Sequence, residues 1–216
     1  MSDKLTSRFF ACSDAKTDKL VLNLPPTWWS RFYEYQWARQ FCAPDDVALD
    51  AGCGICHPFK FYLADACREV HACDIDERIL RPGAILEDIA RDFGAAAAKD
   101  FPVKYFERVH YARASLTSLP YADGKFDKIY CISVLEHLPP HDIYLSLREC
   151  ARTLKDNGLF VLTFDYPTID LAFFSSLLPR AGLTFAGDVS FELPANAVYS
   201  DLYRLYCFRA VLCKKR

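Results

Sequence analysis

The stretch that decides the fold reads Leu-Asp-Ala-Gly-Cys-Gly and occupies residues 49–54. An apolar run, residues 47–50, leads into the glycines, and residues 58–66, with proline in the first turn, are expected to form a helix after them. Glycines between a strand and a helix let the backbone pass close to a ligand, and the start of the helix presents free N–H groups. The stretch therefore predicts a nucleotide-type cofactor site at the first turn of an α/β fold.

Strand-like and helix-like segments alternate after this turn. Further strands are expected at residues 69–74, 109–113, 126–133 and 159–164, and helices at residues 28–42, 82–93, 141–154 and 169–178, with a turn at 155–158. Short links between alternating elements predict a doubly wound, mostly parallel sheet covered on both faces. Two aromatic-rich runs near residues 183–193 and 203–213 are expected to pair as an antiparallel C-terminal hairpin at one sheet edge.

Composition limits the class of protein. The 216 residues, of which 52% are hydrophobic and 25% charged, are enough for one α/β domain with a sizeable core. The formal net charge is -2 and no run of five like charges occurs, so a nucleic-acid partner is not expected. No apolar run reaches the roughly 18 residues of a membrane span, and the first residues are too polar for a signal peptide. We therefore expect a cytoplasmic protein without a membrane partner.

The 10 cysteines are scattered without the spacing of a disulfide framework. We interpret them as reduced thiols that serve mostly as small core residues. Cys53 and Cys56 form one C-x-x-C, but a second such pair or a C-x-x-H is missing, which disfavours zinc. Two consecutive prolines between His137 and His141 break the helical spacing that another candidate metal site would need. We therefore expect no metal.

An acidic residue ends the second expected strand. Asp74 closes the run Val-His-Ala-Cys-Asp, where a carboxylate can accept hydrogen bonds from the two hydroxyls of a ribose. Capping of the next helix is the alternative for Asp74, and it is the favoured interpretation for Asp76. The dehydrogenase fingerprint G-x-G-x-x-G fails, because His57 takes the place of the third glycine. An NAD-binding domain is therefore a weak alternative.

Two further stretches complete a pattern. Residues 119–138 read LPYADGKFDKIYCISVLEHL, and residues 154–159 read LKDNGL. With the glycine turn and Asp74, they make residues 47–164 resemble the class I S-adenosylmethionine-dependent methyltransferases, most of all the small-molecule group that includes the ubiquinone-biosynthesis type. The resemblance implies S-adenosylmethionine as cofactor and a Rossmann-like, mostly parallel, seven-stranded sheet.

The resemblance also implies roles for individual residues. The cofactor residues that it implies are Asp50, Gly52, Cys53 and Gly54 at the methionine part, Asp74 at the ribose, Ile75, Ser115 and Leu116 at the adenine, and Ile132 and Ser133 at the methionyl amine and sulfonium. Two positions depart from the family. Cys56 stands where a third small residue, often glycine, is usual. Ser115 stands where many members carry an aspartate that holds the adenine amine, and its hydroxyl accepts only a neutral, weaker hydrogen bond.

The implied activity is methyl transfer to an O or N atom of a small organic acceptor. The sulfonium is a good leaving group, so alignment and desolvation can supply most of the rate, and a base is needed only for a hydroxyl or a protonated amine. His137 is the candidate catalytic base, because histidine titrates near neutrality. The alternative is that His137 only packs within its Glu-His-Leu-Pro segment. Protein methylation and cofactor binding without catalysis remain alternative functions.

The acceptor side is expected at an N-terminal arm, residues 1–43, which precedes the cofactor domain, residues 44–216. After a start that looks disordered, residues 28–37 hold all three tryptophans. At helical spacing two apolar stripes are expected, more than one docked helix needs. The first consists of Trp29, Tyr33, Trp37 and Phe41, and the second, beside it, of Trp28, Phe32 and Tyr35. Our hypothesis is that this helix lids the site, with Arg31 or Tyr33 reaching the cofactor carboxylate; the alternative is a core or dimer contact.

The residues expected to bind the acceptor are Trp29, Tyr33, Tyr35, Asp165 and Tyr166. The last two follow the fifth expected strand, which ends beside the cofactor. Asp165 is expected to orient an acceptor hydroxyl or amine, or alternatively to cap the next helix. A monomer or a homodimer is expected.

Overall fold

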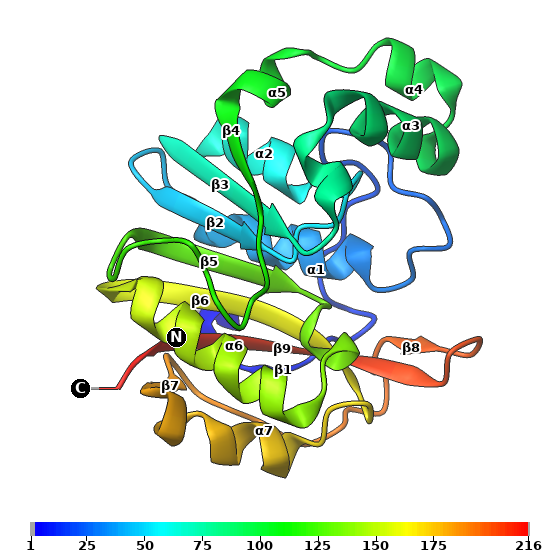
Figure 1. Ribbon diagram of the computed structural model, residues 1–216. Helices are drawn as coiled ribbons and strands as arrows, with labels where there is room; N and C mark the ends of the chain where they lie inside the picture. The colour runs from blue at the N-terminus through cyan, green and yellow to red at the C-terminus, as the bar shows by residue number, and fades with distance from the viewer. Residues whose placement is uncertain (1–2, 216) are drawn as a thin grey trace.

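Apolar strands covered by helices on both faces form the centre of the molecule. In the computed structural model, which describes residues 3–215, the sheet runs in the order β1-β9-β6-β5-β2-β3-β4, with β7 and β8 also paired to β9 (Figure 1). The strands are β1 (Arg8–Phe9), β2 (Val47–Ala51), β3 (Glu69–Asp74), β4 (Val109–Arg113), β5 (Phe126–Ile132), β6 (Leu154–Tyr166), β7 (Leu183–Phe185), β8 (Tyr199–Ser200) and β9 (Leu205–Lys214). The predicted α/β class with a mostly parallel sheet is confirmed.

Seven α-helices are seen in the described residues: α1 (Arg31–Ala38), α2 (Phe59–Ala66), α3 (Pro82–Phe93), α4 (Ala95–Lys99), α5 (Lys104–Arg108), α6 (Pro140–Thr153) and α7 (Leu171–Leu177). The 3-10 turns are η1 (Asp3–Leu5), η2 (Arg39–Phe41), η3 (Glu77–Leu80), η4 (Leu135–His137) and η5 (Pro179–Ala181). The helix expected over residues 28–42 is shorter, because its first residues form turns and its end is η2. No helix within residues 3–215 is long and apolar enough to cross a membrane.

The sheet separates two hydrophobic cores. Because side chains alternate along a strand, Ala48 packs with α1, α2 and α3, and its neighbour Leu49 packs with α6 and α7 on the other face. Both residues are 0% exposed. All ten cysteines are free thiols and seven of them are buried, as the interpretation as small core residues predicts.

Parallel pairing places the carboxyl ends of β2, β3 and β5 at the same end of the sheet. Ala51 pairs with Cys73 between β2 and β3, and Asp50 pairs with Tyr130 between β2 and β5. The connections after β2, β3 and β5 therefore start side by side. Ligands of open α/β sheets bind outside the carboxyl ends of such strands.

The C-terminal part differs from the sequence prediction in two places. The turn expected at residues 155–158 is a bulged part of β6, where the pairing with β5 shifts from Phe126–Leu154 to Lys128–Leu159. The strand expected over residues 183–193 ends at Phe185. The expected antiparallel pairing of β7 with β9 is confirmed.

Part of the N-terminal segment that was expected to be disordered packs against the sheet. Arg8 and Phe9 pair antiparallel with Arg209 and Phe208 of β9, and Phe9 is only 2% exposed. The two-residue strands β1 and β8 explain why the sheet has nine strands instead of the expected seven. Local patterning could not show this, because the strand partners of β1 lie about 200 positions away in the sequence.

Candidate active site

The turn between β2 and α2 depends on its glycines. Gly52 and Gly54 have positive φ angles of 71° and 59°, a region that L-residues rarely adopt. A Cβ on Gly52 would lie 2.6 Å from a Val134 methyl, and one on Gly54 would lie 2.6 Å from the ring of His57. Gly52 and Cys53 also donate backbone hydrogen bonds to the carbonyl of Cys73, which fastens the turn to β3.

A buried lysine stabilises the turn through three hydrogen bonds. Lys60, in α2, is 0% exposed, and its Nζ donates hydrogen bonds to the carbonyl oxygens of Cys53 (3.2 Å), Gly54 (2.8 Å) and His57 (2.8 Å). One ammonium group thus binds three carbonyl oxygens of the same turn. The ammonium therefore sets the shape of the turn and places a positive charge close to Asp50.

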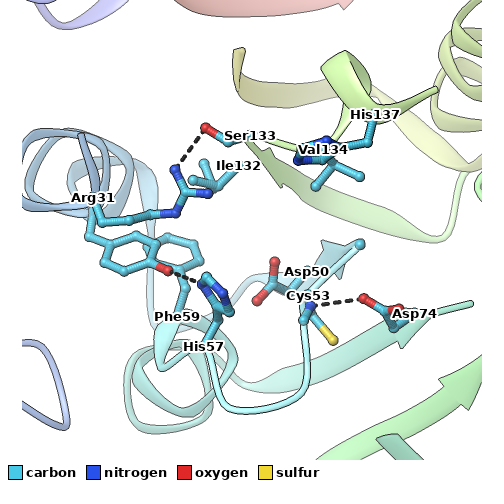
Figure 2. Close-up of a pocket in the computed structure, with 13 residues that line it drawn as sticks. Arg31, Asp50, Cys53, His57, Phe59, Asp74, Ile132, Ser133, Val134 and His137 are labelled. Carbon is cyan, nitrogen blue, oxygen red and sulfur yellow. Dashed lines mark hydrogen bonds between the residues drawn. The ribbon is translucent and has the colours of Figure 1, made fainter. Parts of the chain in front are cut away.

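A cavity of about 240 Å³ opens above this turn, at the carboxyl ends of β2, β3 and β5. Seven of the ten predicted cofactor residues line it: Asp50, Gly52, Cys53, Gly54, Asp74, Ile132 and Ser133. Figure 2 shows Asp50 and Asp74 on the side of the turn and Arg31 with Ser133 on the opposite side. The cavity thus has acidic groups along one wall and a guanidinium on the other.

The two acids differ in their surroundings. Burial, together with the nearby Asp74 charge, raises the pKa of Asp50 to about 7, although Lys60 acts against the rise. Asp50 Oδ2 is buried and lacks a hydrogen-bond partner among the described residues. Asp74 is held in place, since its Oδ2 accepts from the Gly54 amide and its Oδ1 from the Asp76 amide. The favoured interpretation of Asp76, capping of the next helical turn, is confirmed, because its side chain accepts from the Arg78 amide at the start of η3.

The guanidinium on the opposite wall belongs to a buried ion pair in α1. Arg31 donates to Glu34 and, at 2.8 Å, to the hydroxyl of Ser133. Glu34 is 0% exposed and also accepts from the hydroxyls of Ser133 and Thr163. Burial would raise the pKa of Glu34, but the Arg31 charge and these hydrogen bonds outweigh it and lower the pKa. The pair ties α1 to the ends of β5 and β6.

Ser133 adopts a strained backbone conformation at the end of β5. Its φ angle is 48°, which is unusual for a residue other than glycine. Hydrogen bonds from its amide to Thr163 and from its hydroxyl to Glu34 stabilise this conformation. This conformation turns the chain so that Ser133 lies on the wall of two cavities.

A second cavity of about 200 Å³ adjoins the first. The two share Arg31, His57, Ser133 and His137, and the second alone is lined by Thr27, Trp28, Trp29, Ser30, Glu136, Asp165 and Tyr203. The predicted acceptor residues Trp29 and Asp165 therefore lie in one cavity with the candidate base His137. His137 is exposed and reaches both cavities.

Three aromatic rings form the boundary between the cavities. The ring of Trp28 stacks on His57 with centroids 4.3 Å apart, and the hydroxyl of Tyr35 lies 2.9 Å from His57 Nδ1. Burial and the charges of Arg31 and Lys60 keep the pKa of His57 well below its ordinary value. His57 is therefore neutral at physiological pH and serves as a rigid wall.

Several predicted residues lie outside both cavities. Tyr33 lines a separate hollow with Trp29 and Phe32, and Tyr166 packs its ring on Phe9 at 5.3 Å. The side chains of Ile75, Ser115 and Leu116 do not line either cavity in the described chain. Ile75 is 69% exposed. Tyr35 was expected to bind the acceptor. It lines the first cavity, together with most of the predicted cofactor residues.

Glu34, Lys60 and Glu136 were not among the predicted site residues, although Glu34 and Lys60 bond to residues of the cavity wall and Glu136 lines the second cavity. Each is a charged residue inside a mostly apolar helical segment, and this is the only signal that the sequence offers. Their partners lie in other elements, so the pairing was not visible along the chain.

The fold and the site together define a class. A parallel sheet with a glycine turn after its first inner strand, an acid at the end of the next strand and a cavity above both is built to bind a nucleoside-containing cofactor.

The comparisons with known proteins give the family. The family model described as "Methyltransferase domain" matches residues 49–162. A curated protein of Mycobacterium tuberculosis, described as a probable S-adenosylmethionine-dependent methyltransferase, is 32% identical over 142 residues, which cover 63% of this chain and 42% of that protein. The chain thus spans less than half the length of this relative.

Solved structures share the fold. The [4+2]-cyclase SpnF superposes with a TM-score of 0.64 at 15% identity, covering 96% of this chain and 86% of that one. Magnesium protoporphyrin IX methyltransferase from Synechocystis gives 0.56 at 19% identity, covering 82% and 75%. At such identities the likeness concerns the fold alone.

The chain belongs to the methyltransferase domain family, in its class I, S-adenosylmethionine-dependent form. The predicted class and the predicted methyl donor, S-adenosylmethionine, are thereby confirmed. The narrower likeness to the ubiquinone-biosynthesis type stays a prediction.

Proposed function

We propose that this protein binds S-adenosylmethionine in the first cavity and transfers its methyl group to an O or N atom of a small organic acceptor in the second. The observation that carries the proposal is the junction of the two cavities at four shared residues, Arg31, His57, Ser133 and His137. A donor on one side and an acceptor on the other would meet there. Such a junction supplies the alignment that an in-line displacement needs.

The lining of the first cavity fits this cofactor. The glycine turn leaves room for a ligand close to the backbone, and two buried polar atoms without a partner, Asp50 Oδ2 and Arg31 Nε, are available for ligand groups. Asp50 would pair with the α-ammonium, Arg31 with the carboxylate and Asp74 with the ribose hydroxyls. When bound, the cofactor supplies an electrophilic methyl group on a sulfonium. The protein contributes orientation and the exclusion of water.

A small acceptor agrees with the size of the second cavity, about 200 Å³. One structural neighbour is named for methylating magnesium protoporphyrin IX, and another for methylating 1,6-didemethyltoxoflavin, both small molecules. A protein acceptor is the alternative and would have to insert a single side chain. His137, at the mouth of both cavities, is the candidate base for an acceptor that must lose a proton.

Calorimetry tests the cofactor assignment. Replacement Asp74→Ala removes hydrogen bonds to a charged group, worth about 1.5–3 kcal/mol, and should weaken S-adenosylmethionine binding roughly 10- to 150-fold. Asp76→Ala, at the capping residue two positions on, is the matched control and should change the affinity less than threefold. Equal affinities in the wild type and Asp74→Ala would refute the ribose assignment. Wild-type protein that fails to bind S-adenosylmethionine would refute the proposed function.

A further inference from the structure

Two carboxyl groups face the second cavity without partners. Both oxygens of Glu136 and Oδ1 of Asp165 are buried, and none of them makes a hydrogen bond to another described residue. Buried polar groups are nearly always paired, because an unpaired one costs free energy. Three such oxygens at one cavity indicate that a ligand supplies the missing donors.

The charge around these oxygens is unbalanced. Arg31 is the cation on the cavity wall, and its charge is already shared with Glu34 through a direct ion pair. The histidines at the wall are His57, which is neutral, and the exposed His137. Two carboxyls therefore face the cavity with no cation of their own.

Burial and neighbouring charges raise the pKa of both carboxyls. Burial and the charge of Asp165 raise the pKa of Glu136 to about 8, against the opposing effects of a contact with its own backbone amide and of the Arg31 charge. Burial and the charge of Glu34 raise the pKa of Asp165 to about 6, and the charge of Arg31 offsets only part of the rise. A carboxyl in such surroundings gains more from a cationic ligand than an exposed one does, because its ionised form lacks compensation. The pKa of such a carboxyl is also close enough to neutral pH for it to exchange a proton with an amine.

Aromatic side chains complete the cavity. Trp28, Trp29 and Tyr203 line it beside the two acids. The faces of tryptophan and tyrosine rings attract cations, and desolvated sites strengthen the attraction. Acids together with aromatic walls are complementary to an ammonium group carried on an apolar or aromatic body.

We propose that the acceptor of this methyltransferase is a small amine, held as its ammonium by Glu136 and Asp165, and that Glu136 removes the proton that frees the nitrogen lone pair. This inference rests on the proposed function, which left both the acceptor atom and the base open. It assigns the base to Glu136 and leaves His137 at the rim.

The ammonium R–NH3+ gives one proton to the Glu136 carboxylate, which becomes the neutral acid, and the nitrogen becomes R–NH2. Its lone pair forms a bond to the methyl carbon of S-adenosylmethionine while the S–CH3 bond breaks and its electron pair stays on sulfur. The products are the thioether S-adenosylhomocysteine and R–NH2CH3+, which keeps the positive charge.

Matched pairs of probes test the proposal on the full chain saturated with S-adenosylhomocysteine. Benzylamine and benzyl alcohol form one pair, and tryptamine and tryptophol form the other. By calorimetry, each amine is expected to bind at least tenfold more tightly than its alcohol. Equal binding, tighter binding of the alcohols, or no detectable binding of either amine would overturn the proposal.

The isosteric variant Glu136→Gln tests the residue. It should weaken amine binding tenfold or more and change alcohol binding less than twofold, because it removes the charge and keeps the shape. Glu107→Gln, an exposed position in α5, is the matched control and should alter neither. Thermal melting checks folding, and a midpoint at or above that of the wild type is expected, since a buried unpaired acid is removed. An unchanged amine affinity in folded Glu136→Gln would contradict the assignment.

A readout on the chemistry separates this inference from the proposed function. With S-adenosylmethionine and each probe, mass spectrometry should find methylated amine and no methyl ether, and Glu136→Gln should shift the pH profile of the amine reaction. If the protein binds S-adenosylmethionine and methylates only the alcohols, the amine inference fails while the proposed function stands. If S-adenosylmethionine does not bind, the proposed function itself fails.

Discussion

Replacing Asp50 by asparagine should stabilise the free protein and weaken its hold on the cofactor. Asp50 is 3% exposed, and its pKa is raised from 3.8 to about 7, chiefly by burial. Each pKa unit corresponds to about 1.36 kcal/mol of difference between the charged and neutral forms. The shift of about three units therefore means that ionised Asp50 destabilises the native state by about 4 kcal/mol at and above pH 7.

The direction in which the free energy of unfolding changes with pH follows from proton binding. Between about pH 4 and pH 7 the native state holds a proton on Asp50 and the unfolded state does not, so stability falls as the pH rises. In Asp50→Asn this proton is absent from both states. The advantage of the variant should therefore grow by about 1.4 kcal/mol per pH unit across this window and level off above pH 7.

Urea unfolding of wild type and variant from pH 4.5 to pH 8.5 measures this difference directly. Asp45→Asn, at an exposed position, is the control and should show no growth with pH. Calorimetry in parallel should find that S-adenosylmethionine binds the wild type more tightly as the pH rises through 7 and that the variant has lost this rise. A stability difference that stays constant with pH would refute the assignment of a strained buried carboxyl.

Three further substitutions test other parts of the site. Glu34→Gln should lower the free energy of unfolding by about 3 kcal/mol at neutral pH, because it leaves the Arg31 charge buried without its partner. Since the pKa of Glu34 is lowered from 4.5, this contribution exists above that pH and should disappear as the pH falls. Gly52→Ala should cost about 2 kcal/mol or more and abolish cofactor binding, because its φ is 71° and its Cβ would lie 2.6 Å from a Val134 methyl. Lys60→Met should lower the unfolding free energy by about 1–3 kcal/mol and weaken cofactor binding about tenfold, because three carbonyls of the turn lose their donor. Urea unfolding and calorimetry measure all three.

Matched controls come from positions without these contacts. Gly83→Ala has open space around its new Cβ and should be neutral or slightly stabilising. Lys99→Met and Glu107→Gln change exposed residues and should stay within about 0.5 kcal/mol of the wild type. If Gly52→Ala behaved like Gly83→Ala, or Lys60→Met like Lys99→Met, the proposed role of the turn would be wrong.

Prediction from the sequence was most accurate where structure is local. Helix α3 spans residues 82–93 as expected and ends at Gly94, and β4 spans residues 109–113 as expected. Hydrophobic periodicity and helix-stop glycines act over a few residues, so one chain displays them. The bulge in β6 and the strand β1 were missed, because both are stabilised by partners far away in sequence.

The amino-acid sequence by itself determined the glycine turn, the acid at the end of β3 and the alternation of strands and helices that predicts a parallel sheet. These features need only residue type and spacing, because glycine backbone freedom and apolar periodicity are properties of the chain itself. Only the tertiary structure decided which residues of α1 face the cavities and which are buried. Tyr33 and Tyr35 are two residues apart on one helix, yet Tyr35 is on the cavity wall and Tyr33 is outside both cavities. It also brought Glu136 and Asp165 together without partners. The physical reason is that burial and electrostatic coupling depend on distances between elements, and a linear sequence does not contain those distances.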